Sequence, residues 1–148
     1  MTQIAMPSSK PEILLVDDSP ADLDLIRDAL STSICPGHVN TVLDGEEAIA
    51  FLRRAGTYGS AVRPDLIILD LNLPRKAGRL VLADFKSEPT LRSIPVVVFT
   101  TSHSRQDIAR SYELGANCYV SKPGSLEDFR KAVQSIQQFW FAVASLPN

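Results

Sequence analysis

The sequence predicts a single α/β domain built on a doubly wound, five-stranded parallel sheet. The chain has 148 residues, the usual size of one domain, and 45% of them are hydrophobic, which is enough for a sizeable core. Five short apolar runs alternate along the chain with five amphipathic stretches. Because the runs lack the polar alternation of strands that face water on one side, they suit a parallel sheet covered on both faces.

The first half of the chain contains two strand–helix pairs. The apolar run over residues 12–16 is the first predicted strand, and Ser19 then supplies a helix N-cap with Pro20 at the first helical position. Apolar residues at spacings of three and four predict that the first helix continues from Pro20. A second strand is predicted over residues 38–42 and a second helix over residues 46–54.

The second half contains three more pairs, identified by the same two patterns, and Gly115 provides the C-cap of the fourth helix. In chain order we expect a strand over residues 65–69, a helix over 78–87, a strand over 94–99, a helix over 105–114, a strand over 118–120 and a helix from 125 to about 141. Right-handed crossovers then favour the strand order 2-1-3-4-5, in which a ligand binds at the carboxyl ends of the strands.

Composition excludes several classes of protein. The 15 basic and 17 acidic residues give a net charge of −2, which does not support nucleic-acid binding. The sequence has no signal peptide and no run near the roughly 20 apolar residues that a membrane span needs. Cys35 and Cys118 form neither a metal pattern nor a disulfide framework, as expected in a reducing cytosol. We therefore expect a soluble cytoplasmic protein, with a short arm over residues 1–10 and one domain over residues 11–148.

Polar residues follow four of the five predicted strands. Asp17 and Asp18 follow the first, Asp70 the third, Thr100 the fourth and Lys122 the fifth. Taken singly, each aspartate has an ordinary explanation as a turn or cap residue, and Lys122 as a solvated surface lysine. The parallel topology instead brings all five to one edge of the sheet, where crowded carboxylates cost stability and therefore indicate a function.

These residue types fit phosphoryl transfer. Carboxylates bind hard divalent cations such as Mg²⁺, and an aspartate at the end of the central strand can be a nucleophile that forms an acyl phosphate. We expect Asp70 to have that role, since Lys122 offers a point charge to the phosphoryl oxygens and the Thr100 hydroxyl can donate to one of them.

Four segments carry a resemblance to the response-regulator receiver family, with its flavodoxin-like fold. They are ILLVDDSP (13–20), LIILDLNLP (66–74), VVVFTTS (96–102) and CYVSKP (118–123). The resemblance implies that Asp70 is the phospho-acceptor and that Asp17, Asp18, Asp70 and the backbone carbonyl of Asn72 hold Mg²⁺ or another divalent cation. It also implies that Thr100 and Lys122 contact the phosphoryl group and that Tyr119 is a switch whose rotamer follows Thr100. The alternative for Tyr119 is a half-buried strand aromatic. Ala77, where the family often has Asp, leaves the conformation of its loop open.

More narrowly, the chain looks like the small regulators paired with cyanobacterial phytochrome-type kinases. The stretch DLNLPRKAGR and the aromatic tail Phe139, Trp140 and Phe141 carry this likeness. The resemblance implies a sensor histidine kinase, phytochrome-like, as phosphoryl donor and an unidentified downstream protein as target. Because exposed aromatics mark interfaces, we expect a homodimer through the tail, with an intramolecular fold-back as the alternative.

Three rival functions remain to be weighed. A phosphohydrolase with an aspartyl nucleophile usually carries a second aspartate two residues later, but Asn72 occupies that position. A receiver-like module that never takes phosphate is disfavoured because all five site residues are present, and a flavin-binding protein because no phosphate loop follows the first strand. The role of His103, in the loop after Thr100, is left open. We therefore expect a signalling phospho-acceptor that is not a turnover enzyme.

Overall fold

The computed structural model describes residues 10–32 and 37–147 and contains the predicted alternation of strands and helices. The arm predicted over residues 1–10 lies, except for Lys10, outside the described residues, as does Cys35. The strands are β1 (Glu12–Val16), β2 (His38–Val42), β3 (Leu66–Leu69), β4 (Val96–Thr100) and β5 (Cys118–Ser121). The helices are α1 (Pro20–Ser31), α2 (Gly45–Arg53), α3 (Gly78–Lys86), α4 (Arg105–Glu113) and α5 (Leu126–Gln138), with a 3₁₀ turn η1 (Gly56–Tyr58) and a π-helical turn η2 (Phe139–Val143).

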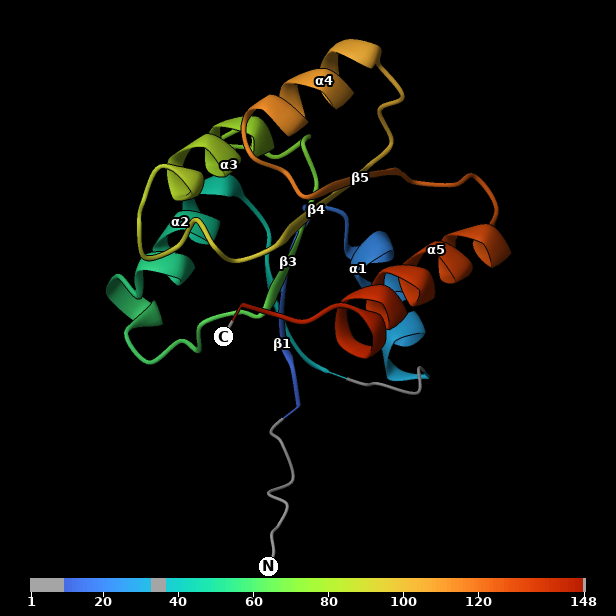
Figure 1. Ribbon diagram of the computed structural model, residues 1–148, viewed down its shortest axis with the longest axis horizontal. Helices are drawn as coiled ribbons and strands as arrows, with labels where there is room; N and C mark the ends of the chain where they lie inside the picture. The colour runs from blue at the N-terminus through green and yellow to red at the C-terminus, as the bar shows by residue number, and fades with distance from the viewer. Residues whose placement is uncertain (1–9, 33–36, 148) are drawn as a thin grey trace, which may run out of the picture.

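All five strands are parallel and follow the predicted order β2-β1-β3-β4-β5. Figure 1 shows α1 and α5 on one face of the sheet and α2, α3 and α4 on the other. Each face has its own apolar cluster, one with residues of α1 and α5 and one with residues of α2 and α3. Burial on both faces explains why the central strands consist of continuous apolar runs.

Side-chain caps begin four of the five α-helices, because the first amides of a helix lack backbone partners. Each cap accepts a hydrogen bond from the amide three residues later, and the caps are Ser19, Asp44, Ser104 and Ser125. The helix α3 has Ala77 at this position and no side-chain cap. The prediction of Ser19 as N-cap with Pro20 at the first helical position is confirmed.

Several element boundaries differ from the prediction by one residue, and two differ by more, for identifiable reasons. The strand expected over residues 94–99 begins at Val96, since Pro95 has no amide proton to donate to a neighbouring strand. The last helix, expected to continue to about residue 141, leaves α-helical geometry after Gln138 and widens into η2, where the Ala144 amide donates to the Phe139 carbonyl. Among the described residues, no helix is long and apolar enough to cross a membrane.

Candidate functional site

The residues predicted at the carboxyl edge of the sheet come together there. Asp17 follows β1, Asp70 follows β3, Thr100 is the last residue of β4 and Lys122 follows β5. All four are buried, with exposed fractions of 0–7%. The backbone keeps the neighbouring ends of β4 and β5 in register, because the Lys122 amide donates to the Thr100 carbonyl.

The Lys122 ammonium lies at the centre of the site. Its Nζ atom is 2.7 Å from Asp17 Oδ2, 2.7 Å from Asp22 Oδ2 and 3.0 Å from Asp70 Oδ2, and its side chain is only 4% exposed. Burial lowers the pKa of Lys122, but the hydrogen bonds to Asp17 and Asp22 and the charge of Asp70 outweigh it and raise the pKa above the ordinary lysine value. Lys122 therefore remains a cation at neutral pH.

Three carboxylates form a cluster suited to a divalent cation. Asp17, Asp18 and Asp70 each offer an oxygen, and these oxygens lie within 4.8 Å of one another. Asp17 and Asp70 are buried, whereas Asp18 is exposed and gives the cluster access to solvent. Burial raises the pKa of Asp17, and its hydrogen bond to Lys122 only partly opposes this effect. A bound cation would relieve the repulsion among the carboxylates, so an all-oxygen donor set of this kind fits Mg²⁺ or Mn²⁺.

Thr100 contributes a buried hydroxyl without a partner. Its side chain is fully buried, and Oγ1 makes no hydrogen bond to any described residue. Because most buried polar atoms are hydrogen-bonded, an unpartnered hydroxyl calls for an explanation. The position of Thr100 at the end of β4, next to the strand that ends at Asp70, provides one: the hydroxyl can donate to a group bound at Asp70.

The loop from Asp70 to Gly78 is shaped by backbone contacts. The Asn72 amide donates to Asp70 Oδ1 at 3.1 Å, and the Gly78 amide donates to the Leu71 carbonyl at 2.9 Å. A Cβ atom at Gly78 would lie 2.2 Å from the Asp70 carbonyl oxygen, so only glycine permits this close approach. The loop thus orients the Asp70 carboxylate even though Ala77 supplies no cap. The structure brings Asn72 to the site, and the role of its carbonyl as a ligand remains a prediction.

Tyr119 is tied to the loop that follows Thr100. Its hydroxyl donates to the Ser102 carbonyl at 3.0 Å, and the Ser121 hydroxyl donates to the same carbonyl at 3.1 Å. Tyr119 is half-buried, and burial raises the pKa of its hydroxyl. This geometry agrees with a half-buried strand aromatic, and the role of Tyr119 as a switch that follows Thr100 remains a prediction.

Asp22 is the site residue that the sequence prediction missed. It lies in the first turn of α1, and its carboxylate is as close to Lys122 as that of Asp17. The signal available in the sequence was its place three residues after the Ser19 cap, because the first turn of α1 starts at the carboxyl edge of the sheet. Other predicted candidates lie outside the site: His103 is exposed, and the aromatic tail follows α5.

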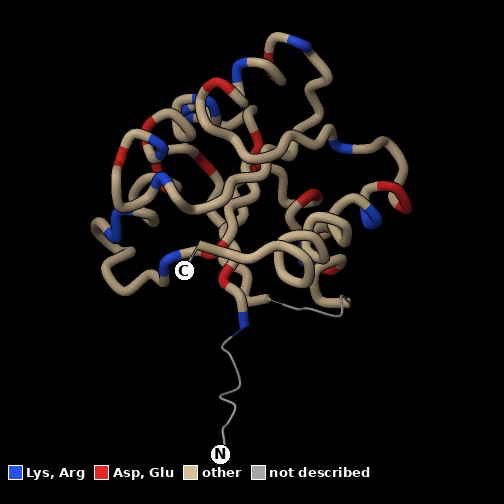
Figure 2. Tube along the Cα trace, in the orientation of Figure 1, with Lys and Arg blue, Asp and Glu red and all other residues tan. Residues whose placement is uncertain are grey.

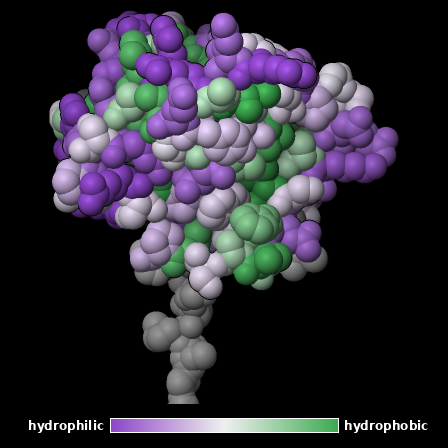
Figure 3. Space-filling view, turned by 45° about the horizontal axis from the view of Figure 1, so that its top comes forward, coloured by the Kyte–Doolittle hydropathy of each residue, from purple (hydrophilic) through white to green (hydrophobic). Residues whose placement is uncertain are grey.

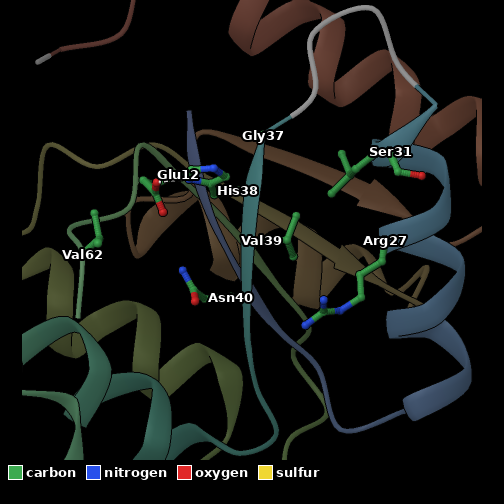
Figure 4. Close-up of a pocket in the computed structure, with 9 residues that line it drawn as sticks. Glu12, Arg27, Ser31, Gly37, His38, Val39, Asn40 and Val62 are labelled. Atoms are coloured by element: carbon green, nitrogen blue, oxygen red, sulfur yellow. Dashed lines mark hydrogen bonds and ion pairs between the residues drawn. The ribbon is translucent and has the colours of Figure 1, made fainter. Parts of the chain in front are cut away.

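Charged residues elsewhere do not converge in the same way. A hollow of about 590 Å³ lies at the amino end of β2, and Figure 4 shows Glu12, Arg27 and His38 among the side chains that line it. The imidazole of His38 pairs with Glu12 at 2.8 Å, and Arg27 donates to Thr41. In Figure 2, Lys and Arg are scattered over several elements and interleaved with Asp and Glu, so the described residues show no basic stripe for nucleic acid.

Comparisons with known proteins agree with the geometry. A family model described as the response regulator receiver domain matches residues 13–134. The chain is 50% identical over 135 residues to the response regulator Rcp1 of Synechocystis, a match that covers 91% of this chain and 92% of Rcp1. Among solved structures it resembles the phosphorylated cyanobacterial phytochrome response regulator RcpA, with a TM-score of 0.92 and 51% identity over 95% of this chain and 100% of RcpA. It also resembles the Mn²⁺-bound form of Rcp1, with a TM-score of 0.90 and 48% identity over 93% of this chain and 99% of that structure.

Proposed function

This chain belongs to the response regulator receiver family, and from that premise we propose that it accepts a phosphoryl group on Asp70 from a sensor histidine kinase. One observation carries the choice of residue. Asp70 is the buried carboxylate at the end of the central strand β3, and Lys122 and the unpartnered Thr100 hydroxyl stand at the ends of β5 and β4 on the same side of it. The Lys122 ammonium and the unpartnered Thr100 hydroxyl are thus both available near Asp70 as donors.

The side chains can perform the transfer in one step. An Asp70 carboxylate oxygen attacks the phosphorus atom, the bond from phosphorus to the donor nitrogen breaks, and the donor histidine leaves as a neutral ring after gaining a proton. Lys122 and Thr100 donate to the phosphoryl oxygens that carry the charge. A divalent cation held by Asp17, Asp18, Asp70 and the Asn72 carbonyl would neutralise charge on the transferring group.

Thr100 and Tyr119 are the proposed switch. When a phosphoryl group is present, the Thr100 hydroxyl gains a partner by turning toward it. Tyr119 reports that change because its hydroxyl contacts the loop that begins after Thr100. Phosphorylation would then shift the protein between two states of this loop, and a partner protein would read the state by contact. Turnover phosphatases use an acid at the position that Asn72 occupies here. The phosphorylated protein is therefore itself the signal, and it does not turn over a substrate.

The kinase partner we propose is phytochrome-like. The support is the likeness of this chain to Rcp1 and to the phytochrome response regulator RcpA, each over more than nine-tenths of its length. We propose that the chain acts inside the cell with such a kinase and an unidentified downstream protein.

We further propose a homodimer through the segment after α5. Trp140 and Phe141 pack in part on the apolar cluster of α1 and α5, which is the fold-back alternative, but Phe139 and Val143 remain 50% and 69% exposed. Figure 3 shows a group of hydrophobic side chains low on the molecule, and others between the hydrophilic side chains above it. Sedimentation of Phe139→Ser should show loss of a dimer that the wild type forms, and a monomeric wild type would contradict this part of the proposal.

The phosphorylation itself is tested by intact-mass analysis with acetyl phosphate, a small-molecule donor. The wild type should gain one phosphoryl group in the presence of Mg²⁺ and none with a chelator, and Asp70→Asn should gain none. A folded wild type that accepts no phosphoryl group from acetyl phosphate or from a purified phytochrome-like kinase would instead identify a phosphate-independent adaptor.

A further inference from the structure

All three donors of the Lys122 ammonium are used by carboxylates, and one of these carboxylates has no part in the proposed chemistry. An ammonium group has three N–H donors. Asp17 and Asp70 accept two of them, and Asp22 accepts the third at 2.7 Å from a helix 100 residues away in sequence. Of these three carboxylates, Asp22 is the one that lies outside the cation cluster formed by Asp17, Asp18 and Asp70.

The other two contacts change during the cycle. Asp17 and Asp70 would share their charge with a bound cation, and Asp70 becomes an acyl phosphate when it takes the phosphoryl group. Both are then weaker acceptors for Lys122. Asp22 keeps its full charge throughout, because it neither binds the cation nor reacts in the proposed function.

Local structure fixes Asp22 in place. Its amide donates to the Ser19 hydroxyl at 3.2 Å in the cap of α1, and its carboxylate lies in the first helical turn, where the helix dipole favours a negative charge. The next residue, Leu23, is 6% exposed and anchors this turn in the core between α1 and α5. The Ser19 cap also connects Asp22 with Asp17, since the Ser19 amide donates to Asp17 Oδ1 at 2.9 Å.

We propose that Asp22 is a positioning residue for phosphoryl transfer, which keeps the Lys122 ammonium at the carboxyl edge of the sheet while Asp17 and Asp70 engage the cation and the phosphoryl group. This inference rests on the proposed function. In the test reaction, the acetyl phosphate P–O bond breaks, a bond from phosphorus to an Asp70 oxygen forms, and acetate leaves with the negative charge that the Asp70 carboxylate brought. Without Asp22, Lys122 is free to swing away from the phosphoryl oxygens.

The experiment compares the phosphorylation rate with acetyl phosphate, at saturating Mg²⁺, in four proteins: the wild type, Asp22→Ala, Asp22→Asn and Asp24→Ala. Asp24 is the matched control, because it is an exposed carboxylate in the same part of α1 with no contact to Lys122. We expect the phosphorylation rate to fall about tenfold in Asp22→Ala, because one charge-assisted hydrogen bond to Lys122 is lost. Asp22→Asn, which keeps an acceptor oxygen of the same reach, should recover part of the rate, and Asp24→Ala should equal the wild type.

A second readout follows the ammonium directly. In ¹⁵N spectra of the lysine side chains, the Lys122 NH₃⁺ signal should be protected from solvent exchange in the wild type and lost in Asp22→Ala. An Asp22→Ala protein that is phosphorylated as fast as the wild type, or faster, overturns the inference, as does a protected Lys122 signal in that variant. If the wild type and Asp24→Ala accept no phosphoryl group either, the proposed function fails instead.

Discussion

The middle of each central strand and the residue just beyond its end are equally buried but chemically opposite. In β1 and β3, Leu14 and Ile67 are 0% and 1% exposed and lie among apolar side chains, whereas Asp17 and Asp70 are 3% and 7% exposed and lie among charges. The switch takes place within one residue of the strand end. Burial of an apolar side chain stabilises a fold, but burial of a carboxylate has a cost that partners must offset.

The two regions have different roles, because the apolar middle of the sheet determines folding and its carboxyl edge determines function. The apolar layer is continuous through both clusters and positions the strand ends. At the carboxyl edge, three carboxylates share one ammonium and Asp18 adds a fourth negative charge beside two of them, so negative charge exceeds positive charge at the site. We infer that burial of apolar side chains in the core offsets the free-energy cost of the crowded charges at the site.

The largest expected effect lies in the core. Replacing Phe85 with Ala removes a fully buried ring from the cluster on the α3 side and should reduce the free energy of unfolding by about 3–5 kcal/mol. Leu80→Ala, at a position 50% exposed on the same helix, is the control and should change it by less than about 0.5 kcal/mol. Chemical denaturation measures both, and equal losses would show that the apolar layer is not the source of stability.

Removal of the ammonium should give the next largest effect. Lys122→Met leaves Asp17, Asp22 and Asp70 without their shared partner. In a chelating buffer the free energy of unfolding should fall by about 2–3 kcal/mol, because buried charge is left uncompensated. Mg²⁺ should restore much of this loss by supplying positive charge to the same carboxylates. A variant as stable as the wild type without a cation would contradict the central place given to Lys122.

Removal of one carboxylate should have the opposite effect and increase the free energy of unfolding. Asp18 belongs to the acidic cluster, and no ammonium or guanidinium is paired with it among the described residues. Asp18→Asn should therefore raise the free energy of unfolding in a chelating buffer, by less than about 1 kcal/mol because solvent screens the exposed Asp18 carboxylate. The same variant should gain less stability than the wild type when Mg²⁺ is added. Thermal unfolding with and without Mg²⁺ tests both statements, and a destabilised variant would show that the carboxylates do not repel one another.

The smallest expected effect is a pH dependence that comes from Asp17. Burial raises the pKa of this carboxyl in the folded chain above its ordinary value of 3.8. The folded chain therefore binds the proton more tightly than the unfolded chain, and the contribution of Asp17 to stability is complete below 3.8 and lost as the pH rises through the folded pKa. Asp17→Asn removes this loss. Its stability relative to the wild type, measured with a chelator, should increase with pH from about 3.8 and then level off, whereas a constant difference would contradict the raised pKa.

Much of this fold could be predicted from the sequence, because parallel strands buried on both faces leave a clear apolar signal. The strand order, the boundaries of β1 and the convergence of Asp17, Asp70 and Lys122 follow from that signal and from topology. Asp22 could not be assigned in the same way. Whether a carboxylate in a first helical turn faces the sheet or the solvent depends on how the helix packs, and Asp24 in the same helix is exposed.

The end of α5 was wrong in the prediction for a related reason. Apolar residues at helical spacing indicate a helix, but they do not distinguish an α-helix from a wider turn. The chain widens at Phe139–Val143, and the adjacent side chains of Trp140 and Phe141 both contact the α1 and α5 cluster. Packing of two neighbouring aromatics therefore decides the local geometry here, which periodicity alone does not reveal.

The most direct test of the account is to locate the phosphoryl group. After reaction with acetyl phosphate and Mg²⁺, borohydride reduces an aspartyl phosphate to homoserine, and peptide mass spectrometry then identifies the modified residue. We expect homoserine at Asp70 alone. Homoserine at Asp17, Asp18 or Asp22 would contradict it, because the nucleophile would then lie outside the end of the central strand.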